Sequence, residues 1–127
     1  MSYKKEIKTN HAPAAIGPYA QAIVANGMLY CSGVLGIDPA TGSLAMTIDQ
    51  QMRQLLNNLQ AILSTAGCSA ADVVKTTVFL KSMSDFAVMN EMYSQFFVSP
   101  FPARSTIEVA RLPKDALVEI ECIAICR

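Results

Sequence analysis

The apolar residues of one central segment repeat with the period of an α-helix, and this repeat constrains the fold more than any other feature. Between Thr47 and Gly67 they occur at spacings of three and four residues, as on the buried face of an amphipathic helix. Thr47 and Gln50 have the spacing of a capping box, and a glycine such as Gly67 commonly ends a helix. The sequence therefore predicts a long helix with one buried face. Its apolar positions are Ile48, Met52, Leu55, Leu56, Leu59, Ile62, Leu63 and Ala66.

Segments on both sides of this helix have the composition of β-strands. Asn26-Gly27 separates two apolar runs, 20–25 and 28–33, and this dipeptide is typical of a type I′ hairpin turn. Residues 73–80 are rich in valine and threonine, which favour strands. Two strands are therefore expected before the long helix and one directly after it.

A second helix and two further strands complete the pattern. Apolar residues recur at helical spacing from about residue 84 or 85 to Phe97, and the prolines at 100 and 102 prevent the helix from continuing. Residues 101–124 then alternate as strand, turn and strand. The order β-β-α-β-α-β-β in a single domain over 1–127 predicts an α+β fold. Its mixed sheet carries two helices on one face, so we expect other subunits to cover the second face.

The composition supports an oligomer and argues against several classes of protein. The chain is 52% hydrophobic and 16% charged, which leaves more apolar surface than a small monomer usually exposes. Ten basic and ten acidic residues give no net charge, whereas proteins that bind phosphate backbones usually have a basic excess. No apolar run is long enough to span a membrane, and the charged N-terminus leads to no secretory signal. We expect a cytoplasmic protein, although the mitochondrial matrix also fits.

The cysteines and the histidine indicate no metal or nucleophilic centre. Cys31, Cys68, Cys122 and Cys126 form no CxxC pair, and free buried thiols are expected in a reducing compartment. Cys122 and Cys126 lie four apart on one predicted strand, about 13 Å from each other, which is too far for a disulfide. His11 is the only histidine and has no metal-ligand partners at suitable spacing.

The last two predicted strands carry charges of opposite sign. Arg104 and Thr106 share one side of the first strand, and Glu119 and Glu121 share one side of the second. If the turn centres on 111–114, antiparallel pairing places the arginine beside the glutamates. Such a group can bind a small anion and direct a water molecule at it. It can equally be a cross-strand salt bridge that determines the register.

Tyr19 is a further candidate because Gly17-Pro18 imposes a turn just before the first strand of the hairpin. Its hydroxyl can reach a pocket, or its ring can pack on the surface. The residues alone do not decide between these two roles. Gly33 and Gly36 lack the spacing of a phosphate-binding loop, so they indicate a strand end with unusual backbone geometry.

Several of these segments resemble the RidA/YjgF family of reactive-intermediate imine deaminases, which are also known as L-PSP endoribonucleases or translation inhibitors. The resemblance spans Ala12 to Ala124, and its most specific motifs are Pro-Ala-Arg-Ser at 102–105 and Glu-Ile-Glu at 119–121. It implies a chorismate-mutase-like α+β fold, assembled as a homotrimer with active sites in clefts between subunits. Supporting segments are 12–21, 32–33, 74–79 and 109–113.

The same resemblance implies an activity that needs no metal or organic cofactor. Members of the family hydrolyse 2-imino acids, such as 2-iminobutanoate and 2-iminopropanoate, to 2-oxo acids and ammonia, which protects pyridoxal-phosphate enzymes. Arg104 matches the arginine that binds the substrate carboxylate, and Glu119 matches the glutamate that orients the attacking water and transfers its proton. The expected substrate-binding positions are Tyr19, Ser32, Gly33, Asn90 and Thr106. Val34 stands where many members have glutamine, and Thr106 replaces a cysteine that some members have.

Two other functions stay open at the level of the sequence. One is a single-strand-specific ribonuclease that inhibits translation, against which the zero net charge and the lack of a histidine pair argue. The other is a non-catalytic module with the same pocket, either a small-ligand sensor or a chaperone-like binder. The sequence does not determine the preferred imino acid.

Overall fold

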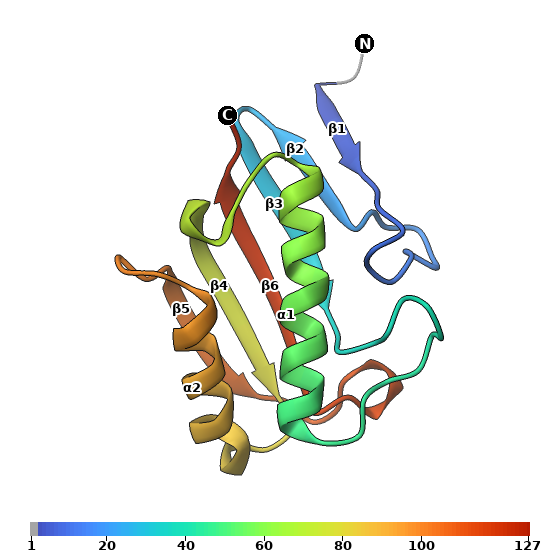
Figure 1. The fold of residues 1–127 in the computed structure, drawn as a ribbon, viewed down its shortest axis with the longest axis vertical. Coiled ribbons are helices and arrows are strands. Elements are labelled where there is room, and N and C mark those ends of the chain that lie inside the picture. The colour runs from blue at the N-terminus through green and yellow to red at the C-terminus, as the bar shows by residue number, and fades with distance from the viewer. Residues whose placement is uncertain (1–2) are drawn as a thin grey trace.

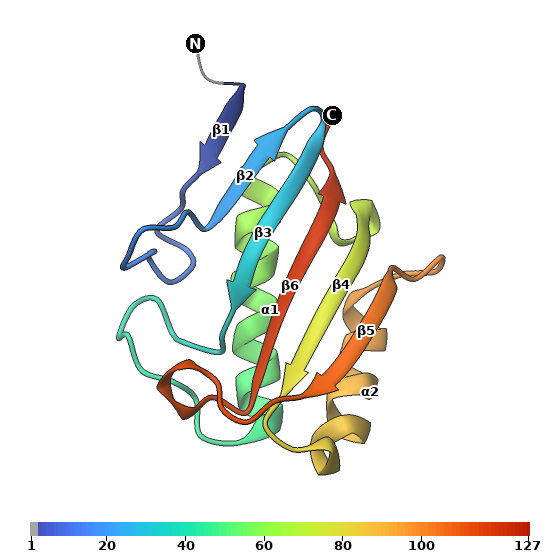
Figure 2. The ribbon, with the colours of Figure 1, turned by 180° about the vertical axis from the view of Figure 1, so that it is seen from behind.

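The computed structural model describes residues 3–127, which form one six-stranded sheet with two α-helices on one of its faces (Figure 1). Within this described part of the chain, no helix lies on the opposite face (Figure 2). The strands are β1 (Lys4–Ile7), β2 (Ala22–Ala25), β3 (Met28–Val34), β4 (Val73–Leu80), β5 (Ala103–Glu108) and β6 (Val118–Ile125). The helices are α1 (Ile48–Thr65) and α2 (Phe86–Phe96), and short 3-10 turns precede β4, α2 and β6. The α+β class and the two helices on one face are confirmed.

The hairpin turn and the two ends of the long helix that the sequence predicts are confirmed. Asn26 and Gly27 have φ angles of 52° and 74°, the left-handed values that a type I′ hairpin turn requires. At the start of α1 the backbone N–H of Gln50 donates to Thr47 Oγ1 at 3.3 Å, and the Gln50 side chain accepts from the Thr47 backbone in return. Gly67 follows the helix with φ 78°, which glycine adopts without strain.

The strand order differs from the simplest interpretation of the sequence. Along the sheet the order is β1-β2-β3-β6-β4-β5, and β4 pairs with β5 in parallel while the other neighbours are antiparallel. The predicted order lacks β1, in which Lys4, Lys5 and Glu6 are exposed and only Ile7 is buried. Charged side chains are common on edge strands, where they discourage pairing with other chains. Because three of its four residues are charged, β1 lacks the apolar alternation by which a strand is predicted from the sequence.

The core lies between α1 and the sheet. Leu55, Leu59 and Leu63 are completely buried on the inner side of α1, as are Leu29 and Ile120 on the strands. This confirms the helical repeat seen in the sequence. Within the described residues, neither helix combines the length and hydropathy that crossing a membrane requires.

One polar residue of α1 holds a loop in place. The amide of Asn58 is fully buried and donates to the carbonyl oxygens of Leu35 at 3.0 Å and Ile37 at 2.8 Å. Buried carbonyl groups need such partners, so Asn58 determines where the chain runs after β3. This segment lines the cavity described below.

The uncovered face of the sheet exposes apolar side chains. Tyr30, Ile107 and Ile125 keep 48%, 45% and 39% of their surface exposed. Apolar side chains that stay exposed on one face of a sheet can provide a binding or assembly surface. The expectation of an uncovered second face is therefore confirmed for the single chain.

Candidate active site

A cavity of about 730 Å³ opens where the C-terminal end of β3 meets the N-terminal end of β6. Four of the seven expected site residues line it: Tyr19, Ser32, Gly33 and Glu119. Glu121 also reaches its wall. The structure thus brings together residues from the turn before β2, from β3 and from β6.

Glu119 is the carboxyl group best placed for chemistry in this cavity. Its side chain is half-buried on the uncovered face of the sheet, opposite Phe79 of β4. Burial, and after it the negative charge of Glu121, raises the pKa of Glu119. A carboxyl whose pKa moves toward neutral pH can both accept and return a proton under physiological conditions.

An irregularity in β3 makes room for this carboxyl group. The register between β3 and β6 shifts between Cys31 and Val34, so Ser32 and Gly33 form a bulge. A Cβ atom at Gly33 would lie 2.7 Å from Cδ of Glu119 and would collide with its carboxylate oxygen. Glycine is needed here because of this close approach, since the carboxylate occupies the space that a side chain would fill.

Gly33→Ala should therefore reduce activity about 10²-fold or more with little change in the melting temperature, because displacing a positioned proton-transfer group costs on this order. The added methyl group meets the flexible end of Glu119, which can move away.

Gly36→Ala is the matched comparison, because its Cβ would lie 2.7 Å from the Cα of Gln51 in α1, and backbone cannot move aside so easily. We expect the second variant to lower the melting temperature. Kinetics and thermal unfolding of both variants test the pair, and full activity in Gly33→Ala would contradict it.

Ser32 and Tyr19 are linked through the backbone. The Ser32 hydroxyl donates to the carbonyl oxygen of Ala20 at 2.6 Å, and its N–H donates to the carbonyl oxygen of Gln21 at 3.0 Å. These bonds fasten the segment that carries Tyr19 to the bulge. Tyr19 itself keeps 53% of its surface exposed, so its ring stands at the rim of the cavity.

Sequence reasoning missed Gln21, which builds one wall of the cavity. Its side chain is buried, accepts from the N–H of Thr9 at 2.8 Å and donates to the carbonyl oxygens of Thr9 at 3.1 Å and Pro13 at 2.7 Å. It therefore holds the loop before β2 against the cavity. A glutamine at the end of an exposed turn gives no sequence signal for such a role, because its partners are all backbone atoms.

Lys114 was also missed as a lining residue, since the sequence analysis assigned it only to the turn before β6. It lies on the cavity wall with φ 58°, and Asp115 follows with φ 57°. Two successive non-glycine residues in the left-handed region are uncommon and are held there by surrounding structure. This turn brings the positive charge of Lys114 to the same cavity as Glu119.

The other expected residues, Arg104, Thr106 and Asn90, lie elsewhere, between β5 and α2. The guanidinium carbon of Arg104 lies 4.7 Å from the ring centre of Tyr93 and 5.6 Å from that of Phe86, both on α2. Stacking on aromatic rings holds the guanidinium group while leaving its donors available. Among residues 3–127, no carboxylate lies within ion-pair distance of it.

The surroundings of Arg104 are organised by a buried pair of hydroxyl groups. Tyr93 OH and Thr76 Oγ1 lie 2.7 Å apart, and the guanidinium group stacks on the ring of the same tyrosine. Burial raises the pKa of the Tyr93 hydroxyl, although the bond from Thr76 and the charge of Arg104 act in the opposite direction. Thr106, two residues further along β5, has a buried Oγ1 for which the described residues provide no hydrogen-bond partner. Asn90 is half-buried on α2.

The expected pairing of Arg104 and Thr106 with Glu119 and Glu121 is wrong. β5 and β6 are not neighbours, because β4 lies between them. Arg104 is level with Thr76 of β4, which is in turn level with Cys122 of β6, and these positions face the helices. Glu119 and Glu121 alternate with Cys122 and therefore face the opposite side. The connection over 109–117 is long enough to pass the end of β4, so the two strands need not form a hairpin.

Neither group of residues has the composition of a metal site. Within residues 3–127, no three or more histidine, cysteine, aspartate or glutamate side chains are grouped so as to hold a metal ion. The chemistry available in the cavity is that of a carboxyl group, a lysine and a tyrosine hydroxyl, with an arginine on the other side of the sheet.

Comparison with known proteins places these residues in context. The family model described as endoribonuclease L-PSP matches residues 9–126. The chain is 50% identical to the 2-iminobutanoate/2-iminopropanoate deaminase of Salmonella typhimurium, over 97% of this chain and 98% of that protein. Its fold is similar to that of the E. coli YjgF gene product, with a TM-score of 0.91, 47% identity and coverage of 97% and 99% of the two chains. E. coli TdcF, solved with bound serine, is 43% identical with a TM-score of 0.90 over 95% and 98%.

Proposed function

The chain belongs to the RidA/YjgF family, and from this premise we propose that it hydrolyses reactive 2-imino acids, such as 2-iminobutanoate and 2-iminopropanoate, to 2-oxo acids and ammonia. The observation that carries the proposal is the half-buried carboxyl group of Glu119, whose pKa is raised and which faces a cavity large enough for a small acid. The relative from Salmonella typhimurium is named for this activity.

In the proposed reaction Glu119 orients a water molecule toward the imine carbon and accepts one of its protons. The oxygen of the water bonds to that carbon, and the electron pair of the C=N bond moves to the nitrogen. Glu119 then returns the proton to nitrogen, which gives a carbinolamine. It next carries the hydroxyl proton of this intermediate to the same nitrogen, so the C–N bond breaks and ammonia leaves as the carbonyl forms. Imines hydrolyse in water without a catalyst, so positioning and charge complementarity can supply the acceleration.

The substrate carboxylate requires a cation, and Arg104 is the proposed partner. Its planar guanidinium group suits two parallel hydrogen bonds to a carboxylate, and no acidic side chain of the described residues occupies it. Support comes from TdcF, which was solved with serine, a compound with a carboxylate and a nitrogen on the adjacent carbon. Lys114 contributes further positive charge on the side of Glu119.

The proposed site needs residues from two subunits, because Arg104 and Glu119 face opposite sides of the sheet in one chain. We propose that a second copy brings its Arg104 to the cavity that contains Glu119, in a homotrimer with one site at each of its interfaces. The exposed Tyr30, Ile107 and Ile125 on the uncovered face provide apolar surface for such contacts. Thr106 and Asn90 would then line the arginine side of each site, and Tyr19, Ser32 and Gly33 the glutamate side.

Removing the charge of Glu121 should move the acidic limb of the pH–activity profile to lower pH. The negative charge of Glu121 is the second cause of the raised pKa of Glu119, after burial. With glutamine at 121, ionising Glu119 costs less, so its pKa falls and the basic form persists in more acidic solution. Profiles of kcat/KM against pH for the wild type and Glu121→Gln measure the shift. A midpoint that stays fixed or rises would contradict this assignment.

The activity itself is tested by coupling the protein to a threonine dehydratase and trapping the released imine with semicarbazide. The protein should suppress semicarbazone formation, and Glu119→Gln should not. An unchanged signal with the wild-type protein would reject the proposal and favour a non-catalytic binding module.

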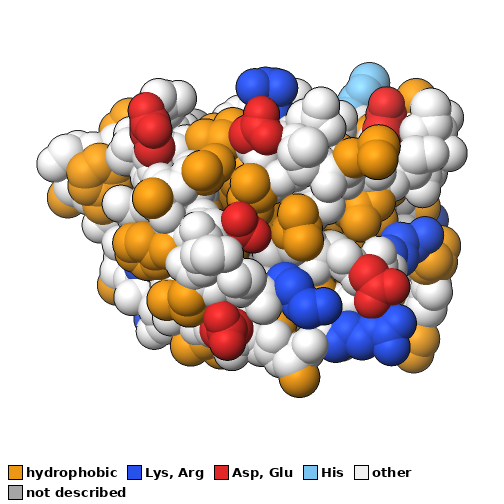
Figure 3. Space-filling model, turned by 90° about the horizontal axis from the view of Figure 1, so that it is seen from below, with side chains coloured by type: hydrophobic (Ala, Val, Ile, Leu, Met, Phe, Trp, Pro, Cys, Tyr) orange, Lys and Arg blue, Asp and Glu red, His pale blue; other side chains and the backbone are white. Residues whose placement is uncertain are grey.

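RNA cleavage, the activity in the family model's name, is tested in parallel on a single-stranded RNA. On the surface seen in Figure 3, acidic and hydrophobic side chains stand among the basic ones, and the chain has no net charge. We therefore expect no cleavage that disappears with Glu119→Gln or Arg104→Ala.

A further inference from the structure

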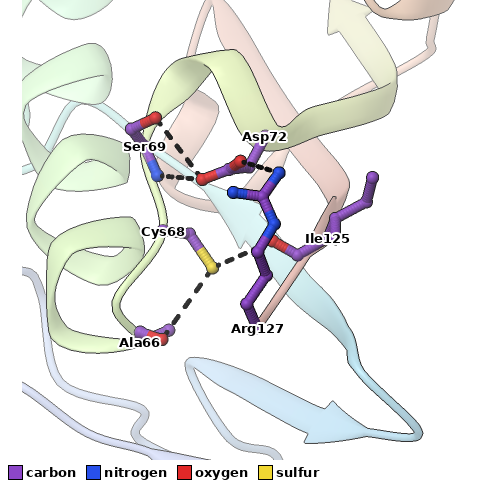
Figure 4. Close-up of polar contacts among 6 residues, drawn as sticks. All are labelled: Ala66, Cys68, Ser69, Asp72, Ile125 and Arg127. Atoms are coloured by element: carbon purple, nitrogen blue, oxygen red, sulfur yellow. Dashed lines mark hydrogen bonds and ion pairs between the residues drawn. The ribbon is translucent and has the colours of Figure 1, made fainter.

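Two cysteines that are far apart in the sequence meet at the C-terminal end of α1. The thiols of Cys68 and Cys126 both point at the carbonyl oxygen of Ala66, at 3.9 Å and 3.2 Å. Cys68 Sγ also lies 3.4 Å from the carbonyl oxygen of Ile125, the residue before Cys126 (Figure 4). The two sulfur atoms therefore converge on one small region.

The backbone holds the two cysteines in this region, and Cys126 contributes to the raised pKa of the Cys68 thiol. The N–H of Cys68 donates to the carbonyl oxygen of Leu63 at 2.8 Å, and the N–H of Cys126 donates to that of Gly27 at 2.8 Å. Both residues are thus anchored to regular structure, so their proximity requires no rearrangement of the chain.

The chain end is fastened over this pair. The guanidinium group of Arg127 lies 3.6 Å from Asp72 Oδ1, and Asp72 Oδ2 accepts from the N–H of Ser69 at 2.9 Å (Figure 4). The contact links the residue after Cys126 to the turn that follows Cys68. It therefore holds the two cysteine-bearing segments against each other.

The two sulfur atoms differ in access to solvent. Cys68 is buried, whereas Cys126 is partly exposed. Burial raises the pKa of the Cys68 thiol to about 11, with further contributions from Cys126, Asp72 and Cys122. Cys68 is therefore protonated at neutral pH, and Cys126 is the thiol that meets a dissolved oxidant first.

We propose that Cys68 and Cys126 form a redox modification site, which hydroperoxides convert to a reversible disulfide between the two residues. The thiolate of Cys126 attacks a peroxide oxygen, the O–O bond breaks and an alcohol or water leaves, which gives a sulfenic acid on Cys126. The sulfur of Cys68 then attacks that of Cys126, the S–O bond breaks, and hydroxide leaves with the proton of Cys68 as water. The two thiols lose two electrons and the peroxide gains them.

The other two cysteines provide an internal comparison. Cys31 and Cys122 are direct cross-strand partners between β3 and β6, and both are buried beneath the helices. Hydrogen bonding to Cys122, together with burial, raises the pKa of Cys31 well above its usual range. Both thiols are buried, so the oxidant should leave them reduced.

The disulfide would close a ring that contains β4, α2, β5 and β6. Such a ring restricts the unfolded chain, so the oxidised protein should melt at a higher temperature than the reduced one. The site lies at the opposite end of β6 from Glu119, and its chemistry does not depend on the proposed deaminase activity.

The test treats the folded protein with hydrogen peroxide, blocks the remaining thiols after denaturation and identifies the modified peptides by mass spectrometry. We expect a mass lower by two hydrogen atoms, a Cys68–Cys126 cross-linked peptide, and complete reversal by dithiothreitol. In Cys68→Ser the sulfenic acid should persist and react with dimedone at Cys126. Cys126→Ser, at the partly exposed position, should show no cross-link, and Cys122→Ser should cross-link like the wild type.

Three outcomes would overturn the proposal. One is a disulfide between Cys31 and Cys122. Another is direct conversion of Cys126 to a sulfinic acid while Cys68 stays free to react with the blocking reagent. The third is a wild-type protein that keeps all its thiols at peroxide concentrations that oxidise Cys126 in the Cys68→Ser variant.

Discussion

Glu119→Gln reduces the turnover of 2-imino acids by about 10²–10⁴-fold, the range that proton transfer by a positioned side chain commonly contributes. The amide has nearly the shape of the carboxyl group, so it fits beside Gly33 and preserves the cavity. It cannot accept a proton from water at neutral pH. We therefore expect the effect in kcat, with KM changed much less.

Two measurements separate this role from a purely structural one. Binding of the product analogue 2-oxobutanoate by calorimetry should persist in Glu119→Gln, whereas Arg104→Ala should weaken it. Glu121→Gln is the matched control, because it removes the neighbouring carboxylate of the same strand face and should retain turnover near its own pH optimum. A Glu119→Gln protein with wild-type kcat would remove Glu119 from the proposed mechanism.

Mixing two inactive variants should restore activity if the site is shared between subunits. Arg104→Ala removes the proposed carboxylate ligand, at a cost of about 2–5 kcal/mol in transition-state binding, as for truncation of one partner in a buried charge pair. Glu119→Ala removes the water-orienting group. Each variant alone is therefore expected to have almost no activity.

The expected gain on mixing can be calculated. Each cleft needs an intact Arg104 from one subunit and an intact Glu119 from the next, so random reassembly of equal amounts restores about a quarter of the clefts in a cyclic oligomer. The experiment dissociates the two proteins in denaturant, refolds them together and compares the activity with separately refolded samples. A double variant, Arg104→Ala with Glu119→Ala, mixed with either single variant is the control and should restore nothing. Activity that stays at the level of the separate variants would place both residues in the site of one chain, or outside the site.

The positions of Arg104 and Glu119 show where sequence reasoning was sufficient and where it failed. Alternation along each strand correctly separated the inner and outer residues of β6, since Glu119 and Glu121 alternate with the buried Ile120 and Cys122. It could not determine which strand lies next to which. Pairing β5 with β6 was the simplest assumption for consecutive strands, and β4 occupies the place between them.

The same limit applies to the cysteines. Spacing along the last predicted strand excluded a Cys122–Cys126 disulfide, and nothing in the sequence indicated that Cys68 would lie near Cys126. That arrangement arises because the turn after α1 passes the end of β6, where Ala66 accepts from both thiols. The role of Gln21 could not be predicted for a related reason, because its partners are backbone atoms of a loop that has no regular sequence pattern.

By itself the sequence determined the elements and their polarity: the capped helix from Thr47, the Asn26-Gly27 hairpin, the strand faces, and the motifs that identify the family. These depend on interactions between residues close in the chain, whose geometry is the same in any fold. Only the tertiary structure decided that Arg104 lies under α2, that Glu119 faces the other side in the space left by Gly33, and that the thiols of Cys68 and Cys126 converge on Ala66. Those arrangements depend on strand order and on long-range packing, which local periodicity does not encode.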